Sequence, residues 1–161
     1  MAIFLGEFDH QIDDKRRLAL PAVFRKRLPK DQEVSLAILP GVDPCLYIVL
    51  EDQLEALGEK LGLLHRGWDE LSRAYVSKLG GLSCTTGLDS QGRLSLSPQQ
   101  LEYAGITDRA IVVGCLSHIE VWDEQRYREH LEMLEKKQLD MRKLAEHALR
   151  DERPARGEGG S

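Results

Sequence analysis

The most informative polar pattern in this sequence is an aspartate followed four residues later by an arginine. Directly ahead of a leucine it occurs twice, as Asp13 with Arg17 and as Asp89 with Arg93. In a tight turn, an Asp carboxylate accepts hydrogen bonds from backbone N–H groups about two residues further on. It can also pair with the arginine at the far end of the turn, and Gly92 suits a turn position that needs positive φ. We therefore expect Asp13, Asp89 and Gly92 to be structural residues of two similar turns.

The two arginines of this pattern have a second candidate role, which is contact with a nucleic acid. Arginine can donate two hydrogen bonds to O6 and N7 of guanine, or it can hold a phosphate. The first motif lies in a basic run, since residues 15–30 contain no acid and seven cations: Lys15, Arg16, Arg17, Arg25, Lys26, Arg27 and Lys30. This local charge of +7 in a chain of net charge −5 predicts a separate positive face suited to phosphate. The alternative is a solvated turn and an amphipathic helix with exposed cations.

The sequence gives little support for catalysis. Its five histidines show no H-E-x-x-H or metal-pair spacing, and it contains neither a G-x-S-x-G motif nor a P-loop. Its three cysteines, Cys45, Cys84 and Cys115, form no C-x-x-C pair, so a zinc ribbon is excluded. We expect buried cysteines and solvent-facing histidines. The sequence therefore predicts no enzyme, no metal site, no cofactor and no small-molecule substrate, and a small hydrolase is an alternative that no motif supports.

The elements that position the two motifs occur twice in the same order. The first copy predicts a strand over 3–11, a strand over 18–20, a short helix over 22–28 and a hairpin over 34–39 and 45–50. The second predicts a strand over 82–87, a strand over 94–96, a short helix over 98–103 and a hairpin over 111–113 and 119–122. A copy of about 45 residues is too small to stand alone. We expect the two copies to pack face to face within one chain.

Apolar residues at helical spacing predict three further helices. Two lie between the copies, over residues 54–64 and from about 68 to 79, and Gly80-Gly81 should end the second. The third runs from about Asp123 to Arg150, with the polar Gln138 interrupting its apolar stripe. Such a stripe is either a coiled-coil seam between subunits or a face packed on the body of the protein. The Gly-rich tail from Pro154 is expected to be disordered.

Bulk features of the chain indicate a cytoplasmic protein. The first seven residues are too short and too soon acidic for a signal peptide, and no segment approaches the roughly 18 apolar residues that a membrane span needs. Three widely separated cysteines suit a reducing compartment. Hydrophobic residues make up 42% and charged residues 30%, a composition typical of a soluble chain with its own core.

The chain resembles the MraZ family over roughly residues 1–130. The resemblance lies in residues 4–8 (FLGEF), 13–22 (DDKRRLALPA), 24–25 (FR), 88–94 (LDSQGRL), 104–106 (AGI) and 119–123 (IEVWD). It implies an α+β fold with two tandem AbrB-like (SpoVT-AbrB) swapped-hairpin domains, which are β-rich with short helices, and a long C-terminal helix. The implied organisation is domain 1 over 7–54, a helical connector over 55–82, domain 2 over 83–126, the C-terminal helix over 127–150 and a disordered tail over 151–161.

The resemblance also implies a function. MraZ proteins form closed rings of many subunits and bind direct repeats in the promoter of the bacterial division and cell-wall gene cluster, usually their own operon. They are commonly repressors and associate with the nucleoid. This implies a sequence-specific DNA-binding regulator whose partners are double-stranded promoter DNA and further copies of itself. The alternative is a ring-forming protein–protein scaffold, but such a scaffold has no need of the basic run over residues 15–30.

Candidate DNA-binding residues follow from the same resemblance. Arg17 matches the first motif arginine of the family and is the first candidate, with Lys15, Arg16 and Arg25 as helpers on one face. Arg93 matches the second motif arginine but lacks a basic surrounding. The family usually has glycine at the position of Arg16, where an arginine with positive φ would cost about 1 kcal/mol or more. Either the first turn differs in this chain, or Arg16 adds a contact and tolerates the strain.

Overall fold

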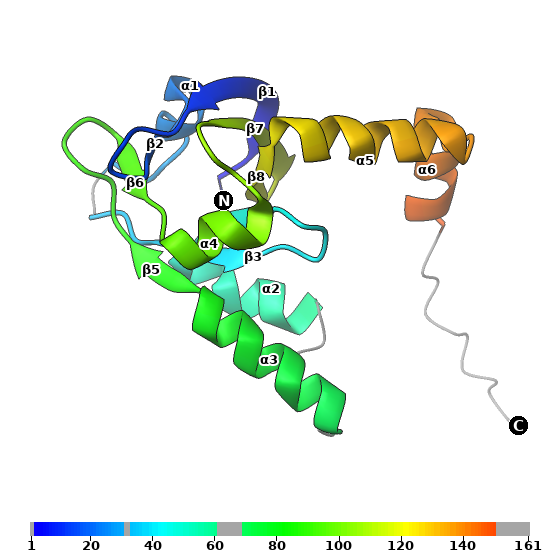
Figure 1. The fold of residues 1–161 in the computed structure, drawn as a ribbon, viewed down its shortest axis with the longest axis horizontal. Helices are drawn as coiled ribbons and strands as arrows, with labels where there is room; N and C mark the ends of the chain where they lie inside the picture. Colours follow the sequence, from blue (N-terminus) through cyan, green and yellow to red (C-terminus); the bar gives the residue numbers. More distant parts are fainter. Residues whose placement is uncertain (1, 31–32, 61–68, 151–161) are drawn as a thin grey trace, which may run out of the picture. The chain divides into compact units, whose positions relative to one another are not determined.

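The computed structural model describes residues 2–30, 33–60 and 69–150 (Figure 1). The predicted α+β class is confirmed, because helices accompany one large antiparallel sheet. The chain divides into two units, Met1–Tyr127 and Arg128–Ser161, and every strand of the described residues lies in the first. None of the helices in the described ranges is long and apolar enough to cross a membrane.

The sheet of the first unit is built from strands of both sequence copies. Its order is β1 (Phe4–Gln11), β7 (Arg109–Leu116), β8 (His118–Asp123), β4 (Leu46–Leu50), β3 (Leu36–Pro40) and β5 (Cys84–Thr86), with antiparallel neighbours throughout. The β3–β4 and β7–β8 pairs are the two predicted hairpins. The β1–β7, β8–β4 and β3–β5 pairs each join the first copy to the second. A separate two-stranded ribbon pairs β2 (Arg17–Ala19) with β6 (Arg93–Ser95).

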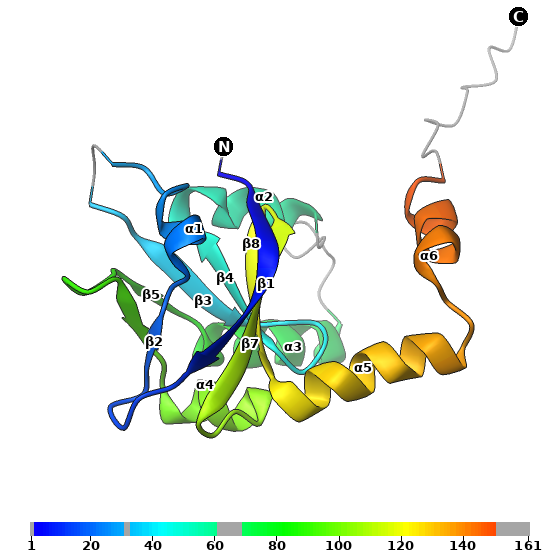
Figure 2. The same ribbon diagram turned by 90° about the horizontal axis from the view of Figure 1, so that it is seen from above.

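The two copies therefore interleave, and the expectation that they pack face to face is wrong. Phe8 of β1 is the partner of Val112 in β7, so segments far apart in the chain lie side by side (Figure 2). This exchange of strands is what a swapped-hairpin class implies, and it takes place within one chain. The ranges 7–54 and 83–126 delimit two sequence copies that fall within a single unit.

The main hydrophobic core joins the β2–β6 ribbon to the sheet. Leu18 of β2 and Leu94 of β6 have no exposed surface and belong to the same buried cluster as the sheet residues. Helix α1 (Ala22–Arg25) adds Phe24, whose ring packs edge-on against Phe4 with the centroids 5.6 Å apart, a favourable aromatic geometry. Since successive side chains of a strand alternate between its faces, the residues flanking the two leucines, among them Arg17, are turned away from this core.

The two short helices that follow the ribbon strands are close to the predictions. The α1 helix follows Pro21 and is shorter than the predicted range 22–28, although single turns continue to Leu28 through backbone hydrogen bonds. Helix α4 (Pro98–Ala104) begins with a capping box between Ser97 and Gln100. It ends at Gly105, whose φ of 67° is the left-handed conformation that glycine adopts without strain.

The connector between the copies is helical, with one error in the predicted boundaries. After the 3₁₀ turn η1 (Glu51–Gln53), helix α2 runs over Leu54–Lys60, and the rest of the predicted range 54–64 lies outside the described residues. Helix α3 (Glu70–Leu82) begins at Asp69, whose side chain accepts a hydrogen bond from the Ser72 N–H at 2.7 Å. The prediction that Gly80-Gly81 ends this helix is wrong, because the helix continues through both glycines to Leu82.

The predicted single C-terminal helix over residues 127–150 is also wrong, because the structure has two helices there. Helix α5 (Glu124–Lys136) ends where Gln138 adopts a left-handed φ of 57° and the Leu139 N–H bonds back to the Leu134 carbonyl. Asp140 then caps helix α6 (Met141–Ala148) by accepting a hydrogen bond from the Lys143 N–H. The polar residue that interrupted the apolar stripe therefore lies in a helix break. The predicted disordered tail lies outside the described residues.

Candidate nucleic-acid interface

The first D-x-x-x-R motif forms a turn held by its own aspartate. Asp13 Oδ1 accepts hydrogen bonds from the backbone N–H groups of Lys15 and Arg17, at 3.0 and 2.8 Å. Its Oδ2 lies 2.7 Å from Arg17 Nε. Desolvation acts to raise the pKa of Asp13, but the backbone and side-chain hydrogen bonds from Arg17 outweigh it and lower that pKa below its ordinary value. The aspartate is thus ionised and neutralised by its own arginine.

The second motif repeats these contacts in the other sequence copy. Asp89 Oδ1 accepts hydrogen bonds from the N–H groups of Gln91 and Arg93, each at 2.9 Å, and Oδ2 lies 2.9 Å from Arg93 Nε. The hydrogen bond from the Arg93 backbone is the main cause of the lowered pKa of Asp89. The expectation that both aspartates build similar turns is consistent with these distances.

The turns also share a left-handed residue just before the motif arginine. Arg16 has a φ of 59° and Gly92 a φ of 73°, so the first turn does not differ from the second. The Arg16 carbonyl accepts a hydrogen bond from the Leu96 N–H at 2.8 Å. The Nε of the Arg16 side chain donates to the Leu96 carbonyl at 3.3 Å. The sequence left two explanations open, a different first turn or a strained Arg16. The positive φ of Arg16 in a turn like the second one supports the strained arginine.

Gly92 is covered by a side chain from the first sequence copy. A Cβ atom built at Gly92 would lie 2.5 Å from Nη1 of Arg25, well inside any normal contact. Arg25 is the last residue of α1 and is itself exposed. The first-copy helix thus places a cation directly on the turn of the second copy, a contact that the sequence alone did not predict.

The β2–β6 ribbon brings the two motifs together. Its register pairs Arg17 with Ser95 and Ala19 with Arg93, and Arg93 Nη1 reaches to 3.7 Å from Asp13 Oδ2. The motif arginines keep 27% and 24% of their side-chain surface exposed, whereas Lys15, Arg16 and Arg25 are exposed residues. All five predicted DNA-binding residues therefore lie around one ribbon, although they come from both sequence copies.

Three more exposed cations, Lys26, Arg27 and Lys30, follow Arg25 along the chain. They belong to the basic run of the sequence, but no resemblance singled them out as candidate contacts. With Lys15, Arg16, Arg17 and Arg25 they give the first copy seven cations between residues 15 and 30. The distribution fits a positive face on an otherwise acidic chain.

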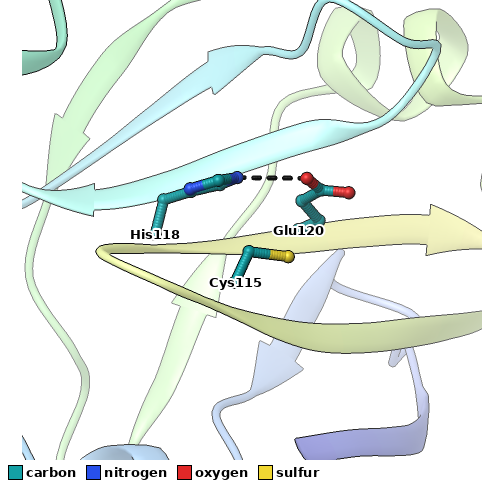
Figure 3. Close-up of side chains that lie close together, drawn as sticks. All are labelled: Cys115, His118 and Glu120. Atoms are coloured by element: carbon teal, nitrogen blue, oxygen red, sulfur yellow. Dashed lines mark hydrogen bonds and ion pairs between the residues drawn. The ribbon is translucent and has the colours of Figure 1, made fainter. Parts of the chain in front are cut away.

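A different polar cluster, which the sequence reasoning missed, lies at the end of the β7–β8 hairpin (Figure 3). It consists of Cys115, His118 and Glu120, and His118 Nε2 is 3.0 Å from Glu120 Oε2. His118 keeps only 21% of its side chain exposed, so the expectation that the histidines face solvent is wrong for it. Burial and the nearby Glu120 carboxylate raise the pKa of Cys115 to about 12. The available signal was the C-x-x-H-x-E spacing, which a search for histidine pairs does not detect.

Comparison with known proteins gives a consistent result. The model of the family described as "MraZ protein, putative antitoxin-like" matches residues 3–61 and 83–151, one segment in each sequence copy. A protein of Thermomicrobium roseum named transcriptional regulator MraZ is 37% identical over 82% of this chain and 89% of its own length. Proteins of the same name from Corynebacterium urealyticum and Limosilactobacillus fermentum are 36% and 34% identical, over 80% and 78% of this chain and 86% and 84% of their own lengths. With matches that span both copies and most of each relative, the chain belongs to the MraZ family.

Proposed function

We propose that this chain is a DNA-binding transcriptional regulator that contacts DNA through the face of the β2–β6 ribbon. One observation carries the proposal: Lys15, Arg16, Arg17, Arg25 and Arg93 gather around a single ribbon, and the two motif aspartates beside them, Asp13 and Asp89, are paired with arginines. The name of the relatives, transcriptional regulator, supports the same conclusion. No catalytic role is part of the proposal.

The geometry suggests how Arg17 would act on DNA. Asp13 holds Arg17 through Nε, which leaves the two terminal nitrogens of the guanidinium to bind another group. A guanidinium that is already oriented loses less entropy when it binds a phosphate or a guanine edge. Asp13 is then a positioning residue for Arg17, and Asp89 has the same role for Arg93. Lys15, Arg16 and Arg25 supply further charge to hold the phosphate backbone.

The finer parts of the proposal follow the family. The regulator would be a cytoplasmic, nucleoid-associated repressor of its own division and cell-wall gene cluster, and it would bind promoter direct repeats as a ring. One basic face of this size binds weakly, but a ring presents several faces to successive repeats, and their contacts combine through effective concentration. This arrangement explains how a chain of net charge −5 could bind DNA tightly.

The substitution Arg17→Ala tests the role of the motif arginine. Promoter affinity should fall about tenfold or more, the effect of losing one bidentate base contact or phosphate clamp. Arg17→Lys should recover only part of this loss, because lysine keeps the charge without the planar fork. The matched control is Lys78→Ala, which removes an exposed cation from α3, away from the ribbon.

Thermal unfolding of each variant shows whether the fold is retained. If folded Arg17→Ala binds the promoter as well as the parent chain does, Arg17 has no part in DNA contact. If both Arg17→Ala and Lys78→Ala weaken binding equally, the effect is one of net charge, and the ribbon is not the contact face.

A further inference from the structure

The Cys115, His118 and Glu120 cluster on the β7–β8 hairpin has no role in the DNA contact proposed above. A sulfur, an imidazole nitrogen and a carboxylate oxygen, one from each residue, all lie within 4.8 Å of one another. Figure 3 shows the three side chains gathered at the end of the hairpin, with the imidazole directed at the carboxylate. The cluster therefore combines three different donor types in a small volume.

The strand geometry explains why these side chains meet. Cys115 and His118 are cross-strand partners at the end of the hairpin, so their side chains lie on the same face of the sheet. Glu120 is two residues after His118 on β8, and residues at that spacing also share a face. Rigid strands rather than a loop thus hold all three ligand atoms.

The repeat indicates that the fold itself does not require this combination. Aligning the two hairpins with Leu46 matched to Ile119 places Cys45 and Tyr47 at the positions of His118 and Glu120. Tyr47 lies in β4 and Cys45 just before it. The first-copy hairpin forms with these residues, and Cys45 is fully buried there. A histidine and a glutamate beside a thiol are therefore specific to the second copy, and they need an explanation other than hairpin formation.

We propose that Cys115, His118 and Glu120 form a binding site for a divalent transition-metal ion of the Zn²⁺ type. Thiolate, imidazole and carboxylate are the donors that Zn²⁺ takes in proteins, and three of them leave a fourth tetrahedral position for water. Metal–ligand distances of 2.0–2.3 Å require donor atoms about 3.5 Å apart, so small side-chain rotations would close this cluster on an ion.

The surroundings already orient two of the three ligands. Trp122 Nε1 donates to Glu120 Oε1 at 2.9 Å, which leaves Oε2 directed at His118. The ring of Tyr47 packs edge-on against the imidazole of His118, with the centroids 4.7 Å apart. On binding, the ion would replace the contact between Nε2 and Oε2, and the Cys115 thiol would release its proton to water. Outer contacts of this kind fix ligand orientation in metal sites.

Metal titration of the untagged full-length chain tests the proposal. Calorimetry should show one Zn²⁺ bound per chain, and Co²⁺ used as a spectroscopic probe should give a thiolate-to-cobalt charge-transfer band. Zn²⁺ in excess should raise the unfolding midpoint by about 5 °C, because the ion binds only the folded hairpin. Cys115→Ser should abolish the cobalt band and weaken Zn²⁺ binding by more than about 100-fold, beyond the roughly 10–100-fold that loss of an outer contact costs.

Two matched controls separate this site from other thiols and histidines. Cys84→Ser changes an exposed cysteine in β5, and His10→Gln changes a histidine in β1, so both variants should bind as the parent does. The absence of saturable binding to the parent chain would overturn the proposal. Binding that survives in folded Cys115→Ser would overturn it as well. If circular dichroism shows that Cys115→Ser is unfolded, His118→Gln decides between the two outcomes by the same titration.

Discussion

At the scale of single residues, the two ribbon turns have the same backbone conformation but differ in backbone strain. Arg16 and Gly92 hold equivalent left-handed positions, with φ values of 59° and 73°. Glycine adopts this conformation freely, whereas a side chain with a Cβ is strained by about 1–2 kcal/mol. A strained arginine in a cationic surface is expected where the side chain itself contributes to function.

We predict that Arg16→Gly separates stability from DNA binding. Relief of strain should raise the free energy of unfolding by about 0.5–1 kcal/mol, since the hydrogen bond lost to Leu96 is long and partly exposed. Promoter affinity should fall because a cation is removed. Urea unfolding and DNA titration measure the two effects, and Arg16→Asn is the control that tolerates the backbone but lacks the charge. A less stable Arg16→Gly would contradict the strain at this position.

At Gly92 the predicted change in the free energy of unfolding has the opposite sign. Gly92→Ala should lower the free energy of unfolding by about 1–2 kcal/mol, because alanine is strained at this φ. The added Cβ would also displace the exposed side chain of Arg25. The control is Gly80→Ala in α3, where no atom lies within 4 Å of the added Cβ. That change should stabilise the protein by about 0.5–1 kcal/mol, the usual gain in a helix. Equal effects of both substitutions in urea unfolding would contradict the account of the turn.

The sequence predicted the local contacts at this scale and missed the distant ones. The Asp13–Arg17 pair lies within a single turn, so its spacing alone implied the contact. The placement of Arg25 on Gly92 and the approach of Arg93 to Asp13 depend on the β2–β6 pairing. No local pattern determines which strand pairs with which, so neither contact could be predicted.

At the scale of elements, hydrophobic patterns predicted the positions of most strands and helices in the sequence. They did not predict which strands pair with one another in the sheet. The alternation of apolar and polar residues indicates which face of a strand is buried. It does not indicate whether β1 pairs within its own copy or with β7. The break between α5 and α6 was missed for another reason. Gln138 has the left-handed conformation usual for glycine at a helix end, and its side chain gives no such signal.

The α6 segment gives a prediction about assembly. Its apolar residues Met141, Leu144 and Leu149 are exposed, as a subunit contact would require. Truncation after Lys136 should therefore lower the number of subunits per particle, obtained as particle mass divided by subunit mass in light scattering, while Tyr127 keeps its packing against Trp122. Truncation after Arg150 is the control and should leave the number of subunits unchanged. An unchanged number of subunits after the first truncation would remove this segment from the interface.

At the scale of the whole molecule, duplication has produced one interleaved unit rather than two separate domains. Both copies contribute strands to the sheet and one strand each to the ribbon, so the candidate DNA-binding face exists only when they fold together. This explains why a second-copy residue, Arg93, lies among first-copy cations although its own sequence neighbourhood is not basic. The face is therefore a property of the assembled unit, and a single copy would not form it.

The most direct test of DNA recognition is fluorescence anisotropy of the full chain titrated onto the duplex upstream of its own operon. A shuffled duplex of the same length and composition serves as the competitor, because charge alone would bind both equally. The account predicts tight binding that the shuffled duplex does not displace. Equal affinity for the two duplexes would contradict it, and the basic face of the ribbon would then belong to another partner, as in a protein–protein scaffold.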